Sequence, residues 1–289
     1  MSNKIIKSCM ALAMAVMMLT ATVLADPANN TVDWEKGVVR ATGLATGSTK
    51  IKNKGLQRAQ AKRAARMDAQ RNLAEAVAGV QIDSESTMQD LMLVNDIVKT
   101  RVSATIKGMS EIDEPKYYDD GTCEITLEMP LYGQNQSVAE AAFIPLQGRE
   151  RVPFPQPTNP SITIDVDVNT VVGGVAGGKY TGLIVDCSGL GLEAVMSPVI
   201  KNNNNVAIYG AQNLDIDRVI ENGMASYAHN ASDSVSRARA GSHPLVVKAV
   251  KAEGIIKGNP VVSVADSDKI LIANQSDMFL DNCAVVFVK

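Results

Sequence analysis

The sequence is poor in the residues on which metal and catalytic sites most often depend. Only two histidines, His229 and His243, occur among 289 residues, and neither has a second ligand at metal-binding spacing. This excludes a histidine-rich metal site. The G-x-S-x-G motif, which would place a serine nucleophile on a sharp turn, is also missing. We therefore assign no catalytic residue, no metal ligand and no cofactor, and we expect a protein that is not an enzyme.

Aromatic residues, cysteines and net charge are also low. Aromatic residues make up 4% of the chain, so the hydrophobic core must be built from Val, Ile, Leu, Ala and Met. The net charge of −3 makes nucleic acid a poor candidate partner. Beyond the N-terminal segment three cysteines remain, Cys123, Cys187 and Cys283, and an odd number cannot be fully paired within one chain. The sequence is compatible with two alternatives, buried free thiols and a Cys187–Cys283 disulfide.

Residues 1–25 have the parts of a secretory signal peptide. Lys4 and Lys7 form a positive start, an apolar run follows, and Val23-Leu24-Ala25 has the small residues of a cleavage site. The apolar run of about 16 residues is shorter than the roughly 20 that a spanning helix needs. Because no cysteine directly follows the cleavage motif, we do not expect a lipid anchor. We expect an exported chain from residue 26 onward, in the periplasm or associated with the outer membrane, without a transmembrane anchor.

Proline marks a boundary in the exported chain, which is long enough for two domains. Five prolines lie between Pro145 and Pro160, and no helix or central strand sustains that density. We interpret residues 145–160 as an extended, semi-rigid linker. This predicts a first domain at residues 26–144 and a C-terminal domain at residues 161–289.

The first domain is organised around a long helix between Gly55 and Gly79. Good helix formers fill it, and an apolar residue recurs every four positions, at Ala61, Ala65, Ala69, Leu73 and Val77. The alanines allow close packing on a sheet, and Gly79 is placed as the C′ residue. We also predict a weaker helix at 84–98, strands at 34–44, 100–112 and 122–132, and a turn at Asp119-Asp120-Gly121. The fold class is α+β, an antiparallel sheet with one long helix packed on it.

This helix and its continuation carry a family resemblance. The pattern consists of Ala61-x-x-Ala64-Ala65-x-x-Asp68-Ala69-x-Arg71-Asn72-Leu73-Ala74-Glu75-x-Val77-x-Gly79-Val80, Thr100-Arg101-Val102, Ile106-Lys107-Gly108 and Asp119-Asp120-Gly121-Thr122-Cys123-Glu124-Ile125. Over residues 34–133 it resembles the twenty-kilodalton bacterial lipoprotein (LPP-type) family, to which the flagellar proteins FlgP and FlgT are similar. The resemblance implies a non-enzymatic cell-envelope protein, linked to the outer membrane or to flagellar and surface structures.

The long helix also carries a basic face. Between Lys50 and Arg71 there are eight basic residues and one acid, which is lopsided for a purely solvated face. One interpretation is contact with an anionic envelope polymer, lipid headgroups or a partner protein. The other is a solvated face beside the carboxylates between Asp83 and Asp96. The candidate partner-binding residues are Arg58, Lys62, Arg63, Arg66 and Arg71.

The C-terminal domain reads as a mixed α+β sheet. We predict strands at 162–172, 180–187, 206–209, 245–252, 261–264 and 283–288. Helices are expected at Asp215–Ala228 and Asp266–Gln275, each capped by its aspartate. A candidate ligand loop follows the strand at 180–187, because glycines permit close approach of a ligand; a loop that simply needs positive φ is the alternative. The residues of this loop are Asp186, Ser188, Gly189 and Gly191.

Two motifs of this domain are incomplete. Gly173 to Lys179 has the G-x4-G-K spacing of a phosphate-binding loop, but a strand follows where that loop requires a helix. Asp165-x-Asp167-x-Asn169 opens like a calcium loop but lacks the glycine and glutamate that complete one. We interpret the first as a hairpin tip and the second as a polar strand face.

These observations predict a non-enzymatic, exported bacterial cell-envelope protein with a binding or scaffolding role, in flagellar or surface-structure assembly. Its expected partners are envelope or flagellar proteins, an anionic envelope polymer, or further copies of itself. The alternative is an envelope-polymer hydrolase or a small-ligand-binding protein that uses the C-terminal domain.

Overall fold

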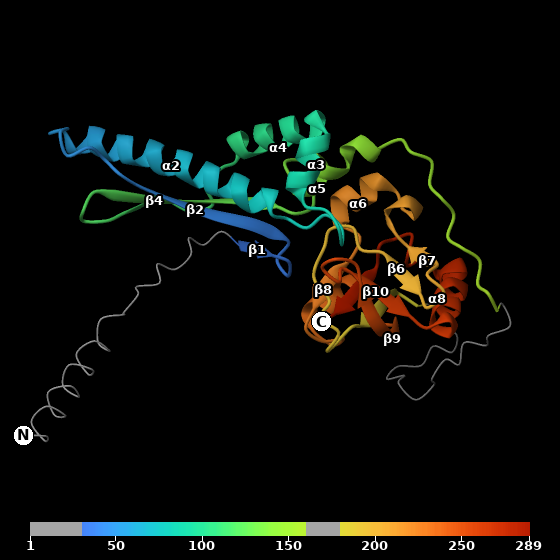
Figure 1. The fold of residues 1–289 in the computed structure, drawn as a ribbon. Helices are drawn as coiled ribbons and strands as arrows, with labels where there is room; N and C mark the ends of the chain where they lie inside the picture. Colours follow the sequence, from blue (N-terminus) through green and yellow to red (C-terminus); the bar gives the residue numbers. More distant parts are fainter. Residues whose placement is uncertain (1–30, 160–179) are drawn as a thin grey trace, which may run out of the picture.

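The computed structural model describes residues 31–159 and 180–289, which form two sheets with helices (Figure 1). The predicted signal peptide, the strand at 162–172 and the motifs at 165–169 and 173–179 lie outside the described residues. The fold class is α+β, as predicted. Within the described ranges, no helix combines the length and hydrophobicity needed to cross a membrane.

The first unit is a four-stranded antiparallel sheet in the order β1-β2-β4-β3. Its strands are β1 (Thr31–Asp33), β2 (Val38–Thr46), β3 (Lys116–Tyr117) and β4 (Thr122–Pro130). The predicted strand at 34–44 is therefore interrupted, because residues 34–37 form the turn between β1 and β2. The turn at Asp119-Asp120-Gly121 lies between β3 and β4 as predicted, with Gly121 at a φ of +85°.

The long helix α2 (Lys54–Ala78) lies along β2 and β4 (Figure 1). Its predicted stripe of three alanines, a leucine and a valine is fully buried. Close approach requires Gly43 in β2, since a Cβ there would lie 2.7 Å from the Cα of Ala69 and closer still to the Ala65 carbonyl. The helix ends at Gly79 as predicted, but with a φ of −79° instead of the left-handed conformation of a typical C′ glycine.

The predicted strand at 100–112 is wrong, because this segment is helical. The chain after α2 forms α3 (Met88–Val94) and α4 (Asp96–Gly108). Val98, Val102 and Ile106 recur every four residues and are the buried side of α4, so the helical period decides the structure. Asn95 starts α4 by accepting the backbone N–H groups of Ile97 and Val98. Two further elements, α5 (Val138–Phe143) and the 3-10 turn η1 (Ile144–Leu146), complete this unit.

The second unit is a seven-stranded mixed sheet in the order β7-β6-β10-β9-β5-β11-β8. The strands β9, β5, β11 and β8 are mutually parallel, whereas β10 runs antiparallel to β9 and β7 antiparallel to β6. The strands are β5 (Gly182–Asp186), β6 (Ile200–Asn202), β7 (Ala207–Tyr209), β8 (Ser226–Ala228), β9 (Pro244–Glu253), β10 (Asn259–Val262) and β11 (Val285–Val288). The helical elements are η3 (Ala211–Asn213), α6 (Ile216–Asn222), α7 (Ser234–Ala240) and α8 (Val264–Asp277).

Two helix predictions in this unit need correction. Asp215 caps α6 as predicted, but the helix stops at Asn222, where Gly223 takes a φ of +73°, and residues 226–228 form β8. The cap of α8 is Ser263, which accepts the N–H of Asp266, so Asp266 belongs to the first turn. The helix α6 is thus shorter than predicted, and α8 begins before the predicted cap.

The three described cysteines, Cys123, Cys187 and Cys283, are buried free thiols, so the Cys187–Cys283 disulfide is absent. The strand order supplies the reason. Cys187 follows the end of β5, whereas Cys283 precedes the start of β11, and these two strands are parallel neighbours. The thiols therefore lie at opposite ends of the sheet, roughly 20 Å apart along the strand direction.

The two units share one hydrophobic core, which includes Leu73 of α2 and Phe287 of β11. Backbone hydrogen bonds cross the junction from Met196 N–H to Gln81 O (3.0 Å) and from Ser197 N–H to Ile82 O (2.7 Å). The helices α5 and α6 also pack together. The first unit is thus held as an arm on the second (Figure 1).

The described part of the proline-rich segment lies along the second unit (Figure 1). Val152 donates its N–H to Gln212 O at 2.8 Å. The carboxylate of Asp268 accepts the N–H groups of Thr158 (2.6 Å) and Asn159 (3.0 Å). Residues 147–159 have no helix or strand, and hydrogen bonds of their backbone attach them to the C-terminal unit, whereas the first residues of the predicted linker belong to η1.

Candidate functional site

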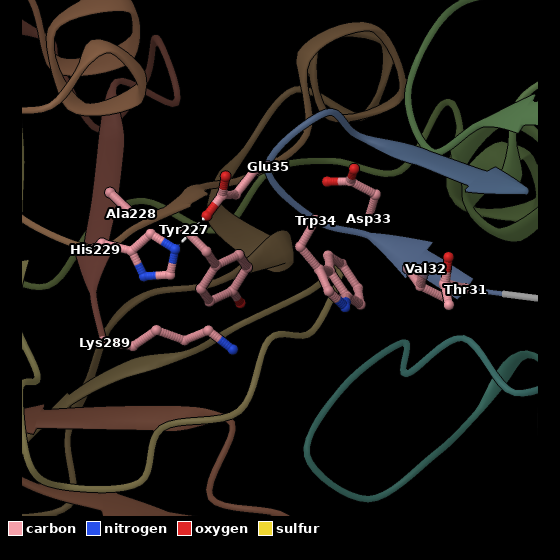
Figure 2. Close-up of a pocket in the computed structure, with 9 residues that line it drawn as sticks. All are labelled: Thr31, Val32, Asp33, Trp34, Glu35, Tyr227, Ala228, His229 and Lys289. Atoms are coloured by element: carbon pink, nitrogen blue, oxygen red, sulfur yellow. Dashed lines mark ion pairs between the residues drawn. The ribbon is translucent and has the colours of Figure 1, made fainter. Parts of the chain in front are cut away.

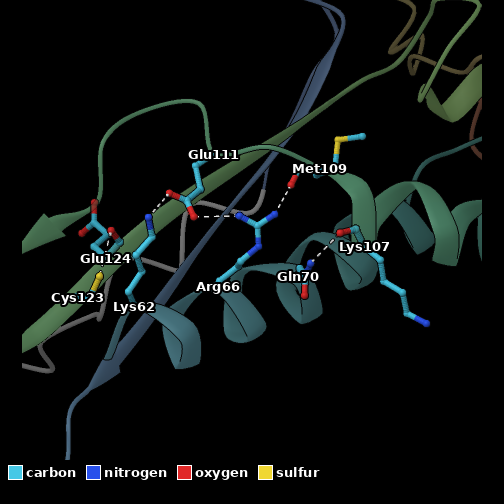
Figure 3. Close-up of polar contacts among 8 residues, drawn as sticks. All are labelled: Lys62, Arg66, Gln70, Lys107, Met109, Glu111, Cys123 and Glu124. Atoms are coloured by element: carbon cyan, nitrogen blue, oxygen red, sulfur yellow. Dashed lines mark hydrogen bonds and ion pairs between the residues drawn. The ribbon is translucent and has the colours of Figure 1, made fainter. Parts of the chain in front are cut away.

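The basic face of α2 is partly used inside the molecule (Figure 3). Glu111, which follows α4, pairs with Lys62 at 3.2 Å and with Arg66 at 2.9 Å. Arg66 also donates to the carbonyl of Met109 at 2.6 Å. Two of the five predicted partner-binding residues therefore hold the end of α4 against α2.

The other three predicted residues are exposed. Arg71 pairs with Asp68 one turn away, and the guanidinium of Arg58 lies 5.4 Å from the ring centre of Tyr117. No charged partner is found for Arg63 among the described residues. The acids that pair with this face are therefore Glu111 and Asp68. The sequence suggested the carboxylates at 83–96 for this role, but in the part of the chain that the structure describes none of them forms an ion pair with α2.

The predicted ligand loop is a glycine-dependent turn. Asp186 accepts the backbone N–H of Ser188 at 2.9 Å, and hydrogen bonding by Ser188 lowers the pKa of the Asp186 carboxyl. Gly189 and Gly191 have φ values of +76° and +67°, which other residues rarely adopt. These contacts are those of a tight loop, and none of the four residues lines the cavities described below.

A cavity of about 350 Å³ lies at the junction of the two units (Figure 2). This volume is within the range of small-molecule sites. The edge strand β1 and its following turn form one side, and the edge strand β8 forms the other. The lining residues are Thr31, Val32, Asp33, Trp34, Glu35, Tyr227, Ala228, His229 and Lys289.

An aromatic pair forms the apolar part of this cavity. Trp34, the only tryptophan of the chain, meets Tyr227 edge to face at 5.8 Å between ring centres. The Tyr227 hydroxyl donates to Val195 O (2.8 Å) and accepts from Val195 N–H (2.9 Å). Because its hydroxyl is occupied, Tyr227 offers its ring and not its oxygen to the cavity. Burial also raises the pKa of this hydroxyl, which therefore stays protonated at neutral pH.

Charged groups surround the aromatic pair. His229 Nε2 lies 2.6 Å from the Glu35 carboxylate, and Figure 2 shows this pair joining the two sides of the cavity. The Lys289 ammonium is 6.0 Å from the centre of the Tyr227 ring. On the β1 side, Asp33 accepts the N–H of Lys36, which lowers the pKa of its carboxyl. The lining thus combines an apolar ring face with two carboxylates, an imidazole and an ammonium, and suits a polar ligand that also has an apolar face.

One local feature of the sequence points to this cavity, although it was not among the predicted site residues. Trp34 is the only tryptophan and stands between two acids, Asp33 and Glu35. Its partners Tyr227, His229 and Lys289 come from the far end of the chain, and only the sheet order brings them together. Within residues 31–159 and 180–289, no group of three or more His, Cys, Asp or Glu side chains is arranged to hold a metal ion.

A second, smaller feature is the space beside the proline-rich segment. Cavities of about 330 Å³ and about 190 Å³ lie between this segment and the start of α6, and both are lined by Arg149 and Arg151. Asp215 and Asp217 line the smaller cavity as well. The larger cavity is lined mainly by apolar residues and the smaller one by opposite charges, and we assign no ligand to either.

Comparison with known proteins gives a match over the second unit. Residues 182–289 match the family described as Treponema pallidum Tp0624, second domain. The match begins at β5 and runs through β11, so it covers the seven-stranded sheet and its helices. No curated protein matches the chain. The match does not reach the first unit, where the resemblance to the twenty-kilodalton lipoprotein family stays a prediction. The C-terminal unit of this chain is thus similar to the second domain of Tp0624.

Proposed function

We propose that this protein is a non-enzymatic, exported bacterial cell-envelope protein that acts as a scaffold, with the α2 arm as its contact surface. The observation that carries this proposal is the common core of the two units. A scaffold must hold its binding surfaces in fixed relative positions, and a shared core with backbone hydrogen bonds across the junction provides this. At 25 residues, α2 is about 37 Å long, so the arm reaches well beyond the second unit.

Two further observations support the proposal. The first 25 residues have the pattern of a secretory signal. The exposed cations of the arm, Lys50, Lys52, Lys54 and Arg63, have no acidic partner among the described residues and are available for an external contact. The finer assignment, a relative of the twenty-kilodalton lipoproteins with a role in flagellar or surface-structure assembly, rests on the sequence pattern at residues 34–133.

The test is to isolate the protein from its native host with a C-terminal tag. We expect recovery with outer-membrane or surface-structure proteins, and loss of those partners when Lys50, Lys52, Lys54 and Arg63 are changed to Glu. Arg66 is left unchanged, because it holds Glu111 and Met109 and its loss would confuse binding with folding. A protein that is free in the periplasm without partners would contradict the scaffold role.

A second candidate function, small-ligand binding, is favoured by the junction cavity. Trp34 lines the cavity and is the only tryptophan, so intrinsic fluorescence reports on occupancy directly. We expect disaccharide and peptide fragments of the cell wall to shift this emission, with the Glu35→Gln variant binding more weakly by calorimetry. Unchanged emission and no heat across such a set would eliminate this function.

A further inference from the structure

Three large aliphatic side chains stand exposed where α3 meets α4. Leu93, Val94 and Ile97 are 77%, 83% and 58% exposed. They are close in sequence, on either side of the helix junction at Asn95. Scattered exposed apolar residues are ordinary, but a contiguous group marks an interaction surface. We name this surface the α3–α4 corner.

The corner is acidic around its apolar centre. Asp90 precedes it in sequence, Asp96 lies between Val94 and Ile97, and both acids are exposed. From Asn72 to Val98 the chain contains no Lys or Arg, and the first base to follow is Lys99. The acids of this stretch are Glu75, Asp83, Glu85, Asp90 and Asp96.

The opposite end of α2 has the complementary character. Lys50, Lys52 and Lys54 are exposed in the β2–α2 loop and at the first residue of α2. Leu56 in the first turn is 59% exposed, and Arg58 follows it. The acids on this side are Asp119 and Asp120 in the β3–β4 turn, which contacts the loop through a Gly47–Gly121 hydrogen bond. We name Lys50, Lys52, Lys54, Leu56 and Arg58 the arm tip.

The two surfaces cannot meet within one molecule. The tip is at the start of α2, whereas Val80, just after its end, binds the start of α3 through a hydrogen bond from Met88 N–H. The 25 residues of α2 therefore separate the surfaces by about 37 Å.

We propose that copies of this protein associate head to tail, with the arm tip of one copy docked on the α3–α4 corner of the next. A basic surface with an apolar centre then meets an acidic surface with an apolar centre. The contact is heterologous, so each copy keeps one free tip or one free corner, and association continues beyond the dimer. This inference deepens the proposed scaffold function by naming the partner of the tip as a second copy. An anionic lipid surface is the competing partner of a basic tip, but the molecule itself carries a matching acidic surface.

The experiment is sedimentation velocity on the purified exported chain, residues 26–289, over a range of protein concentrations. We expect the weight-average sedimentation coefficient to rise with concentration at about 50 mM salt and to return toward the monomer at about 0.5 M salt. The tip variant (Lys50→Glu, Lys52→Glu, Lys54→Glu) and the corner variant (Leu93→Ser, Val94→Ser) are each expected to weaken association by about tenfold or more. All five positions are exposed, so these changes spare the core.

Mixing the two variants gives the decisive result. The corner variant keeps an intact tip and the tip variant keeps an intact corner, so an equimolar mixture should form dimers and nothing larger. A dimer made through tip–tip or corner–corner contacts would not be restored by mixing, and an antiparallel dimer with two tip–corner contacts would stop at the dimer in the unaltered protein. The control variant reverses Arg237, Lys248 and Lys257, which are also exposed and have no ion pair among the described residues but lie on the second unit, and it should associate like the unaltered protein.

Three outcomes would overturn the inference. They are an unaltered protein that stays monomeric at every concentration, variants that associate normally, and a mixture that stays monomeric. If the tip variant instead loses binding to anionic phospholipid vesicles while self-association is unchanged, the tip belongs to a lipid surface and the head-to-tail contact is rejected. Because this assay uses purified protein alone, its failure leaves the co-purification test of the scaffold function untouched.

Discussion

At the scale of single residues, Gly43 decides whether α2 can lie on the first sheet. A Cβ at this position would overlap the backbone of Ala65 and Ala69, and helix backbone cannot move aside as a side chain can. We expect Gly43→Ala to lower the free energy of unfolding by about 1–3 kcal/mol or more. Urea unfolding followed by circular dichroism measures this. Gly79→Ala is the matched control, since Gly79 has a φ of −79° and an added Cβ makes ordinary van der Waals contacts with the carbonyls of Ala76 (3.5 Å) and Glu75 (3.8 Å). A change within about 0.5 kcal/mol is expected there.

The thiols give a second prediction at this scale. Burial raises the pKa of the Cys187 thiol to about 12 and raises those of Cys123 and Cys283. The reactive thiolate is therefore almost absent at pH 8. For residues 26–289, we expect a disulfide-exchange reagent to modify no thiol in the folded protein and three thiols after unfolding without a reductant. A single reactive thiol after unfolding would instead indicate a disulfide between two of the three cysteines.

At the scale of elements, Arg66 joins α2 to the end of α4. It donates to Glu111 at 2.9 Å and to Met109 O at 2.6 Å, and hydrogen bonds of a charged group in a partly buried place are stronger than those at the surface. We expect Arg66→Ala to cost about 1–2 kcal/mol of unfolding free energy. Arg63 lies three positions before Arg66 on the same helix, and Arg63→Ala should change the free energy of unfolding by less than about 0.5 kcal/mol. Equal effects of the two variants would show that the Arg66 contacts are not formed in solution.

The elements also show what the sequence could predict. The stripe of α2 repeats over five buried positions in a long segment of good helix formers, so the helix and its buried face were correctly predicted. In α4, Val102, Ala104 and Ile106 alternate like a strand over a short window, while Val98, Val102 and Ile106 follow a helical period. The longer pattern was the correct one. Short windows cannot separate these periods, because positions four apart satisfy both.

The candidate sites could be predicted only in part, because their residues are far apart in the sequence. The sequence pattern grouped the basic residues of α2 as a candidate partner surface, but it could not show that Lys62 and Arg66 meet Glu111, which is 45 positions beyond Arg66. The junction cavity joins Trp34 to Tyr227 and Lys289 across most of the chain, and the order of strands in two sheets places them together. Neither contact leaves a local pattern in the sequence.

At the scale of the whole molecule, the shared core predicts that the two units unfold together. Buried residues of both sheets belong to one hydrophobic cluster. Ser84 accepts two hydrogen bonds across the junction, from the side-chain amide of Asn259 and from the backbone N–H of Ile256. Separating the units would expose this apolar surface to water, which costs about 25 cal/mol per Å². A proline-rich segment between two domains would ordinarily allow independent unfolding, and here the contacts oppose it.

Cysteine labelling along a denaturant gradient tests this coupling, because Cys123 lies in the arm and Cys187 and Cys283 lie in the second unit. We expect all three thiols to become reactive at the same denaturant concentration. Leu73→Ala removes a fully buried side chain of α2 and should cost about 2–5 kcal/mol. This change should lower the denaturant concentration at which Cys187 and Cys283 are labelled by as much as it does for Cys123, although Cys187 and Cys283 are in the other unit. The control is Leu93→Ala, the same change at an exposed leucine, which should move none of them. If Leu73→Ala shifts Cys123 alone, the arm unfolds independently, and a common core no longer explains how the arm keeps its position on the second unit.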